Sequence, residues 1–413
     1  MYRLSTLGRA AALGAAGCLM ALAACQQTRD VVAPIVPPTA ANPIFQSYVA
    51  IGNSITAGYQ SSGINDSTQR QSYARLLAGA MNTTYRYPSL AMPGCPAPIA
   101  NTQTGARVGA GSGAPGCSGR TFNTDTSEIL TNVAVPDARV LDPISVSTVA
   151  SNVLTDIFLR GQTQVQQALR AKPTFVSIWI GNNDVLAAGA TGLLTPFPGV
   201  SPGIVSTQAQ FQTSYDAMIK QLTDGAPGLK GVLIGVVQIP GIAVLSRGDT
   251  LFKSAAAKGA INAATGKSVT ISPDCSGSTS LVNIPLLISA IRSGSHPAVI
   301  SCNKGVFPAP VGDIFVLDPA EQTTIQDVIT GYNTYIAAKA AAVGFAYYDP
   351  NLLLAAQRAA KNVPALPNFA SATATFGTLF SLDGVHPAAA AHVLLASGIA
   401  SAINAKYGTT IAP

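Results

Sequence analysis

The stretch Tyr48-Val-Ala-Ile-Gly-Asn-Ser-Ile-Thr-Ala-Gly58 decides how the rest of the chain is interpreted. Its first four residues form an apolar run of the kind that a buried parallel strand uses. Gly52 and Asn53 favour a turn, which places Ser54 where the chain leaves the sheet. Open α/β sheets carry their functional sites at the carboxyl ends of their strands. Ser54 is therefore a candidate nucleophile, and the remaining chain must supply a base, an orienting acid and an oxyanion hole.

The base must come from one of three histidines. His386 lies in Ser381-Leu-Asp-Gly-Val-His-Pro387, three residues after Asp383. This spacing lets the carboxylate reach one ring nitrogen while the other faces a serine, whereas the alternative is a capped turn without chemistry. His392 lies in an apolar helical pattern and is interpreted as a core or rim residue. His296 lies in a loop and is interpreted as solvated or structural.

Two further motifs offer donors to an oxyanion. The clearest buried strand covers 174–180 and ends in Gly181-Asn-Asn-Asp184. An amide at a strand end can donate to a developing oxyanion, and Asn183 is the candidate because Gly181 gives the backbone freedom to aim it. The alternative is that these polar residues only cap the next helix. Gly94 would present a bare backbone N–H, unless it belongs to an ordinary Pro-Gly turn.

Together these motifs resemble those of the SGNH hydrolases, the GDSL family of lipases and esterases. They stand in the family's order as Gly52-Asn-Ser-Ile55, Gly94, Gly181-Asn-Asn-Asp184 and Asp383-Gly-Val-His386. The resemblance implies that Ser54 is the nucleophile and that His386 is the base, oriented by Asp383. It also implies an oxyanion hole made by the backbone N–H groups of Ser54 and Gly94 and the side chain of Asn183. The resulting mechanism needs no cofactor.

One position departs from the family pattern. The first block normally reads Gly-Asp-Ser, and Asn53 replaces the Asp. An Asn keeps the size and one acceptor oxygen but removes the charge. The catalytic set does not depend on it, because Asp383 supplies the acid. The Gly-x-Ser-x-Gly pattern of the α/β-hydrolases is absent, since Thr56 stands at the place of its last Gly.

Strand and helix patterns alternate along the chain. They predict a three-layer α/β/α sandwich around a parallel sheet of about five strands, of the SGNH or flavodoxin-like type. Besides the two strands above, strands are expected at 84–87, 231–237 and 344–349. Helices are expected at 72–81, 149–170, 208–223, 332–342 and 388–404.

Residues 44–413 are interpreted as one domain with insertions at about 96–145 and 241–320. A loop at 189–206 follows the Asn183 motif closely. Its apolar side chains are candidates for an acyl pocket, namely Leu193, Leu194, Phe197 and Val200. The alternative is a loop that packs on its own core.

The N-terminus resembles that of a bacterial lipoprotein. Residues 1–24 combine a basic start with an apolar run too short to span a bilayer. The run ends in Leu22-Ala-Ala-Cys25, which resembles a lipobox whose Cys becomes the lipidated N-terminus; the alternative is a plain secretory signal. Residues 25–43 are expected to be a tether. We expect a bacterial envelope protein, held on the outer membrane by its lipid and facing the periplasm or the surface, or else a secreted protein.

The remaining cysteines suit an oxidising compartment. After Cys18 and Cys25, the chain contains Cys95, Cys117, Cys275 and Cys302. Four cysteines allow three connectivities, and the sequential one, Cys95–Cys117 with Cys275–Cys302, closes two short loops. A zinc site is the rival, but neither a Cys-x-x-Cys motif nor a nearby histidine supports it, so no metal is expected.

Composition limits the function classes. The net charge is +6, without a clustered Lys/Arg patch, so no nucleic-acid partner is expected. Only 10% of residues are charged and the mean hydropathy is +0.33, which fits an exported protein. We predict a serine esterase or lipase that cleaves carboxylic esters of acyl lipids or acylated glycans through an acyl-enzyme. The alternatives are a polysaccharide or glycan deacetylase of the same fold, and a surface lipoprotein that binds lipid or glycan without turnover.

Overall fold

The computed structural model describes residues 40, 42–113, 128–146, 153–307 and 313–413. The chain divides into two units, and the second, Thr39–Pro413, contains all the described elements. The predicted signal peptide, most of the predicted tether, Cys25 and Cys117 lie outside the described residues. None of the helices in the described ranges combines the length and the apolar character that a membrane span requires.

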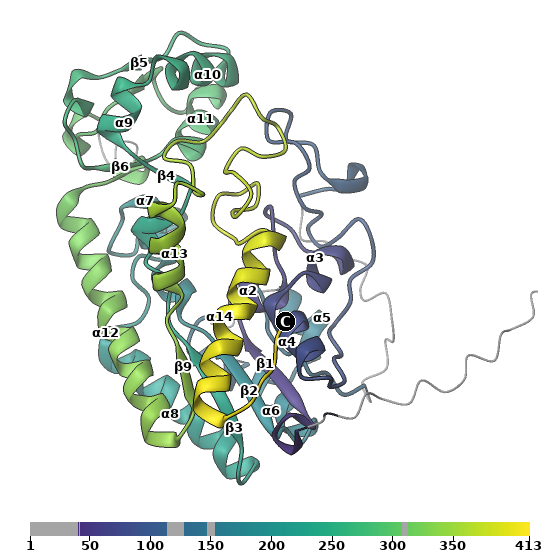
Figure 1. Cartoon of the computed structure of the whole chain (residues 1–413). Helices are drawn as coiled ribbons and strands as arrows, with labels where there is room; N and C mark the ends of the chain where they lie inside the picture. The colour runs from purple at the N-terminus through teal and green to yellow at the C-terminus, as the bar shows by residue number, and fades with distance from the viewer. Residues whose placement is uncertain (1–39, 41, 114–127, 147–152, 308–312) are drawn as a thin grey trace, which may run out of the picture. The chain divides into compact units, whose positions relative to one another are not determined.

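A parallel sheet of four strands lies at the centre of the fold (Figure 1). Its order is β1 (Tyr48–Gly52), β2 (Phe175–Trp179), β3 (Lys230–Ile234) and β9 (Ala346–Tyr348). Gly52 pairs with Trp179, so β1 and β2 end side by side. Every residue of these two strands is buried, as the apolar runs predict for a sheet covered on both faces. The predicted α/β fold class is confirmed.

The strand predicted at 84–87 is wrong, and another segment takes its place beside β1. Ala50 N donates to Thr131 O at 2.7 Å, and Val133 N donates to Ala50 O at 3.0 Å. Arg86 N donates to the side chain of Thr131 and Arg86 O accepts from both Thr131 N and Asn132 N, which is not the alternation of a strand ladder. Residues 131–135 thus complete the flavodoxin-like order at the edge of the sheet. This part of the predicted insertion at 96–145 belongs to the core fold.

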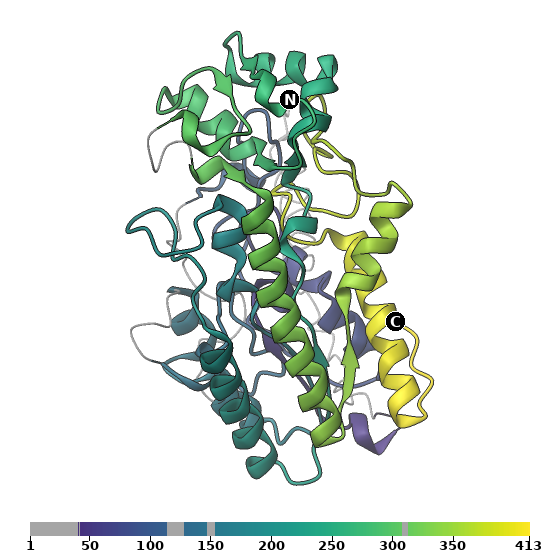
Figure 2. The ribbon, with the colours of Figure 1, turned by 90° about the vertical axis from the view of Figure 1, so that its left-hand side faces the viewer.

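Helices cover both faces of the sheet (Figures 1 and 2). One face packs on α5 (Val153–Leu159), α6 (Gln164–Arg170), α8 (Gln208–Gly225) and α12 (Pro319–Val343). The other packs on α4 (Tyr73–Ala80) and α14 (Ala389–Tyr407). Side chains alternate along a strand, so Val49 and Ile51 enter the first core while Tyr48 and Ala50 enter the second. The result is the predicted three-layer sandwich.

The predicted helices are present, with one division. The part of the 149–170 pattern that is described, from Val153 on, forms two helices, α5 and α6, because Arg160 and Gly161 take positive φ values of 52° and 77° between them. Thr163 then caps α6 by accepting from Gln166 N at 3.0 Å. Shorter helices are α2 (Ser54–Ala57), α3 (Asp66–Arg70), α7 (Leu186–Thr191) and α13 (Pro350–Ala359). Short 3-10 helices are η1 (Pro43–Phe45), η2 (Val108–Ala110), η3 (Asp142–Ile144), η4 (Asn182–Asp184) and η5 (Ile239–Gly241).

The predicted insertion at 241–320 is a lobe with its own hydrophobic core, which includes Leu251, Ile261, Val282 and Ile288. An antiparallel sheet joins β4 (Leu245–Arg247), β6 (Leu281–Asn283) and β8 (Val316–Leu317). A second pair joins β5 (Thr270–Ile271) and β7 (Val299–Ile300). The lobe also contains α9 (Gly248–Lys253), α10 (Ala255–Thr265), α11 (Ile284–Ser293), η6 (Pro273–Cys275), η7 (Lys304–Val306) and η8 (Asp313–Phe315).

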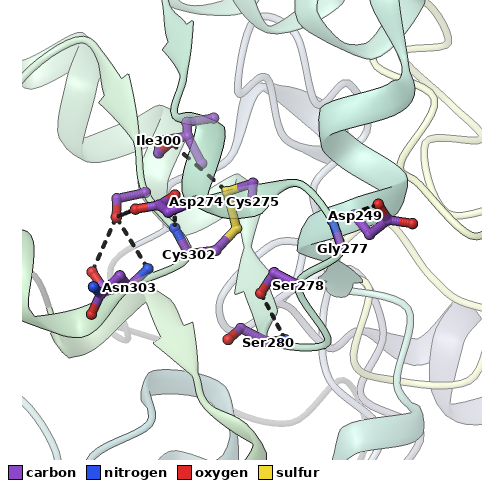
Figure 3. The surroundings of a disulfide bond; sticks show 10 residues. Asp249, Asp274, Cys275, Gly277, Ser278, Ser280, Ile300, Cys302 and Asn303 are labelled. Atoms are coloured by element: carbon purple, nitrogen blue, oxygen red, sulfur yellow. Dashed lines mark hydrogen bonds between the residues drawn. A yellow bond between two sulfur atoms is a disulfide. The ribbon is translucent and has the colours of Figure 1, made fainter.

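A disulfide joins Cys275 to Cys302 inside this lobe, with the two Cα atoms 4.9 Å apart (Figure 3). Asp274 beside it accepts from Ser301 Oγ at 2.5 Å and from Cys302 N at 3.0 Å. Both sulfurs are bonded to each other, so neither is a free thiolate for a metal. Cys95 is also disulfide-bonded, and its predicted partner, Cys117, lies outside the described residues.

Candidate active site

Ser54 lies in a tight connection from β1 to α2. Asn53 caps α2, because its Oδ1 accepts from Ile55 N at 3.1 Å. Ser54 is the first residue of this helix, so its own N–H has no intrahelical acceptor. Gly52 is required, since a Cβ there would lie 2.6 Å from the Trp179 carbonyl oxygen. The local sequence therefore fixes the hydroxyl at the carboxyl edge of the sheet.

Three predicted residues form one hydrogen-bonded chain. The Oγ of Ser54 lies 2.9 Å from Nε2 of His386. Nδ1 of the same ring lies 2.8 Å from Oδ2 of Asp383. A neutral imidazole with its proton on Nδ1 donates to the carboxylate and leaves Nε2 to accept from the hydroxyl. The structure thus brings together residues that are far apart in the sequence.

Asp383 is held as an anion. Its Oδ1 accepts from the backbone N–H groups of Val385 and His386, at 2.9 and 2.8 Å. Burial alone would raise the pKa of Asp383, but the charge of His386 and these hydrogen bonds hold that pKa well below its usual range. The carboxylate therefore fixes the ring and remains ionised across the physiological pH range.

The sequence alone did not reveal the segment that clamps this turn. Ser62 N donates to Oδ2 of Asp383 at 2.8 Å, and Ser61 N donates to Ser381 Oγ at 2.8 Å. Ser381 Oγ in turn donates to Oδ1 of Asp383 at 3.0 Å. Ser61 and Ser62 have positive φ values of 56° and 53°, unusual for residues other than glycine. The signal in the sequence was only a short polar loop.

Tyr59 is a second residue that the motifs did not reveal. Its ring centroid lies 4.9 Å from that of His386 at an interplanar angle of 53°. Tyr59 N donates to the carbonyl of Ser54, so the aromatic ring is fixed relative to the nucleophile. Burial, followed by the charges of Asp137 and Asp383, raises the pKa of Tyr59, and its phenol therefore stays neutral.

Gly94 lies between two cis peptide bonds, Met92–Pro93 and Cys95–Pro96. Its φ is +124°, and a Cβ there would lie 2.5 Å from the Ile64 carbonyl oxygen, so only glycine fits. Within the described residues its N–H donates to no acceptor. It is not hydrogen-bonded to the Ser54–His386–Asp383 chain.

Asn183 is likewise outside that chain. It lies in η4, directly after β2, and its Nδ2 donates to Ala138 O at 2.9 Å. The neighbouring Asp184 is fully buried and accepts from Val140 N at 2.9 Å and Ser206 Oγ at 2.5 Å. Burial, only partly offset by these donors, raises the pKa of Asp184 to about 6. Asn183 and Asp184 therefore both hydrogen-bond to the backbone of the segment that contains Ala138 and Val140.

The other histidines are structural. His392 is fully buried in α14, and its Nδ1 accepts from Tyr73 N at 3.2 Å. Burial lowers the pKa of His392 to about 3, so the ring is neutral. His296 is also buried, rather than solvated, and packs against Phe307 and Phe315.

An apolar pocket is lined by sequence neighbours of Ser54 and His386, and no residue of the 189–206 loop lines it. Leu194 packs on the main core, while Phe197 and Val200 are 38% and 40% exposed. The pocket has a volume of about 80 Å³. Its walls include Ile55, which follows Ser54, and Val385 and Pro387, which flank His386. The other walls are Trp179, Val237, Ile242, Val363, Leu379, Phe380, α13 (Pro350, Leu353, Leu354, Gln357) and α14 (Ala391, Leu394, Leu395).

A family model described as "GDSL-like Lipase/Acylhydrolase" matches residues 48–399. The chain belongs to this family. The fold and the ester hydrolase class that the four motifs predict are thereby confirmed. A comparison with curated protein sequences found no match.

Solved structures that resemble this chain are distant in sequence. A catalytic mutant of Axe2, an acetylxylan esterase from Geobacillus stearothermophilus, is 12% identical over 89% of this chain and 96% of that chain, with a TM-score of 0.39. TesA is 13% identical over 87% and 99%, with a TM-score of 0.35. An extracellular lipase from Streptomyces rimosus is 16% identical over 87% and 99%, with a TM-score of 0.35.

Proposed function

We propose that this GDSL hydrolase is a serine esterase in which Ser54 is the nucleophile, His386 the base and Asp383 the orienting acid. The observation that carries this proposal is the hydrogen-bonded chain from Asp383 through His386 to Ser54 at the carboxyl end of β1. A binding protein without turnover would have no use for an imidazole held between a hydroxyl and an ionised carboxylate.

In the first half-reaction, Ser54 Oγ attacks the ester carbonyl carbon while His386 Nε2 accepts the hydroxyl proton. The bond from the carbonyl carbon to the alcohol oxygen then breaks, and Nε2 returns the proton to that oxygen. Water, deprotonated by the same nitrogen, cleaves the acyl-enzyme and releases the acid. Asp383 stabilises the transient imidazolium, and because its pKa is held low it remains ionised throughout.

The oxyanion hole is proposed to contain the N–H groups of Ser54 and Gly94 and the amide of Asn183. Nδ2 of Asn183 carries two hydrogens, and its bond to Ala138 occupies only one of them. That bond fixes the amide before substrate arrives, which is what electrostatic preorganisation requires.

The apolar pocket is proposed to hold the acyl chain. Its lining is almost entirely apolar, so it suits a hydrocarbon chain and offers few polar partners to a sugar. The enzyme should therefore prefer esters of medium-length acids to acetate. This favours an acyl ester over the acetylated glycan that a deacetylase would require.

The localisation is part of the same proposal. Cys25 would be lipidated and would hold the esterase on the bacterial envelope, with the outer membrane as the expected site. The lipobox-like Leu22-Ala-Ala-Cys25 supports this, as does a disulfide in the lobe. Mass spectrometry of the mature N-terminus tests it, and an unmodified peptide that begins elsewhere would contradict it.

The test of function is hydrolysis of p-nitrophenyl esters from acetyl to palmitoyl. Wild type should turn over esters of medium-length acids faster than acetate, and Ser54→Ala should be inactive but folded. Ala391→Phe fills the pocket and should shift the optimum toward acetate, whereas Ala320→Phe on the exposed side of α12 should not. Acetate-only activity in the wild type would favour a deacetylase. No turnover by the folded wild type would favour a binding protein.

A further inference from the structure

A pocket of about 460 Å³, called here the arginine pocket, lies where the lobe meets the long helices of the sandwich. Its walls include β4 and α9 of the lobe together with α12 and α13 (Figure 1). Arg247, at the end of β4, and Arg358, in the last turn of α13, both line it. None of the described residues that line the pocket is Asp or Glu. The pocket is therefore lined by positive charge without a matching acid.

We infer that the arginine pocket binds a small organic phosphate, whose phosphate group is held by Arg247 and Arg358. This inference goes beyond the proposed esterase function and does not depend on it, because neither Ser54 nor His386 lines the pocket. Leu354 is the one described residue that lines both this pocket and the apolar pocket proposed for the acyl chain. The arguments are the uncompensated charge of the pocket, its remaining hydrogen-bond donors and its size.

Arg358 is a partly buried cation, and among the described residues no carboxylate pairs with it. Its Nε donates to Gly241 O at 2.7 Å, and its Nη2 donates to Ile242 O at 3.1 Å. The carbonyl oxygens satisfy these two N–H groups but carry no net charge, and burial lowers the pKa of Arg358. A guanidinium group has five N–H donors, so three remain for a ligand. An anion in the pocket would supply the opposite charge that a buried cation requires.

Arg247 adds a second positive charge to the same pocket. Its side chain is exposed, and no described residue accepts a hydrogen bond from it. The acid nearest to it in the sequence, Asp249, instead accepts from Lys253 Nζ at 2.7 Å and from Gly277 N at 2.8 Å. The hydrogen bond from Lys253 lowers the pKa of Asp249 most, and the charge of Arg247 lowers it least. Two cations at one cavity repel each other, whereas both attract an anion bound between them.

The size and the other walls define the class of ligand. A volume of about 460 Å³ lies within the range of about 300 to 1,000 Å³ that is typical of small-molecule sites, and a bare phosphate ion would leave most of it unfilled. Leu245, Leu281 and Leu354 provide apolar walls for an organic group, and Thr250 contributes a hydroxyl. A phosphate monoester has three terminal oxygens and a charge near −2, so it can use two guanidinium groups more fully than a carboxylate can.

The test is isothermal titration calorimetry of the full chain with three probes: phenyl phosphate, benzoate and inorganic phosphate. Benzoate has the same ring with a carboxylate, and inorganic phosphate has no organic part. The variants are Arg247→Gln and Arg358→Gln, measured separately. The control is Arg292→Gln, which removes an exposed arginine of the lobe that does not line this pocket. Circular dichroism checks that each variant is folded.

We expect the wild type to bind phenyl phosphate more tightly than either of the other probes, and added NaCl should weaken this binding. Each pocket variant should weaken it by roughly tenfold or more, and the control should match the wild type. Arg247→Gln keeps the test decisive if the loss of the two carbonyl contacts unfolds Arg358→Gln, because the Arg247 side chain donates to no described residue.

Three results would overturn the inference. The first is a folded wild type that does not bind phenyl phosphate, and the second is an unchanged affinity in folded Arg247→Gln. The third is benzoate or inorganic phosphate binding as tightly as phenyl phosphate, because the ligand would then not be an organic phosphate. A loss of affinity in Arg292→Gln equal to that in Arg247→Gln would also count against the pocket, since it would show a general effect of net charge.

Discussion

Asp184 should make the stability of this protein depend on pH. The carboxyl group is fully buried, and among the described residues only Val140 N and Ser206 Oγ donate to it. Burial outweighs these donors and raises the pKa of Asp184 from 3.8 to about 6 in the folded state. A carboxyl group with a raised folded pKa binds its proton more tightly when folded than when unfolded.

The sign and size of the effect follow from this shift. The stabilising contribution of the protonated group is fully present below the unfolded pKa, near 4, and is lost as the pH rises through the folded pKa, about 6. One pKa unit corresponds to about 1.4 kcal/mol, so the shift is worth about 3 kcal/mol. At pH 7.5 the folded protein therefore carries a buried charge that costs about 3 kcal/mol relative to pH 4.

Asp184→Asn isolates this contribution, because an amide has nearly the same shape and does not titrate. It loses one of the two hydrogen bonds, at a cost of about 1 to 3 kcal/mol that does not change with pH. The free energy of unfolding, measured by urea denaturation from pH 4 to 7.5, should shift by about 3 kcal/mol in favour of the variant as the pH rises. Groups that titrate in both proteins cancel in this difference.

Asp216→Asn is a control of opposite sign. Lys339 and Tyr335 outweigh the partial burial of Asp216 and lower its pKa, so its contribution is present above its unfolded pKa and is lost as the pH falls. The difference in the free energy of unfolding between this variant and the wild type should change with pH in the opposite direction. The change should also be smaller, because the side chain of Asp216 is half exposed. A flat difference curve for Asp184→Asn would show that the buried carboxyl ionises normally and would refute the reasoning.

Three further changes test the site and the lobe. Asn183→Ala should lower kcat by about 100- to 1000-fold with an unchanged circular dichroism spectrum, and near-normal turnover would remove this amide from the oxyanion hole. Asp383→Asn should lower kcat about 10,000-fold, because an amide cannot fix the required tautomer of His386, and a loss under tenfold in kinetic assays would contradict its role. Replacing Cys275 and Cys302 by Ala opens a loop with a sequence separation of 27 residues and should cost about 3 to 4 kcal/mol of lobe stability. Limited proteolysis should then cleave the lobe faster than in the wild type. An unchanged cleavage rate would argue against that contribution.

The parts of the fold that the sequence predicted are those whose signal is local. The buried strand at Phe175–Trp179 is an uninterrupted apolar run, and its period and length follow from burial on both faces. The turn after Tyr48–Gly52 contains its own cap in Asn53, so the position of Ser54 follows from neighbouring residues. The Asp-x-x-His turn is also local, because Asp383 accepts from backbone groups two and three residues later.

The parts that the sequence did not predict depend on contacts between distant segments. Residues 131–135 pair with β1 without a strand pattern of their own, since an edge segment needs only a few hydrogen bonds. Ser62 reaches Asp383 through a backbone N–H, a group that every residue other than proline carries, and it therefore leaves no trace in residue type. The loop at 189–206 is a candidate acyl pocket in the sequence because it is apolar and near Asn183. The apolar pocket that we propose for the acyl chain is instead lined by several separate segments, which no local pattern announces.

The exception in the first motif, Asn53, is explained by its surroundings. Its side chain is fully buried, Oδ1 caps the helix that begins at Ser54, and within the described residues Nδ2 has no hydrogen-bond partner. A carboxylate in the same place would give the same cap but would bury a charge with a single donor, Ile55 N, to stabilise it. The cap needs one acceptor and no charge, so an amide performs the structural role at a lower desolvation cost. Because Asp383 already provides the ionised group behind His386, the replacement leaves the hydrogen-bonded chain to Ser54 intact.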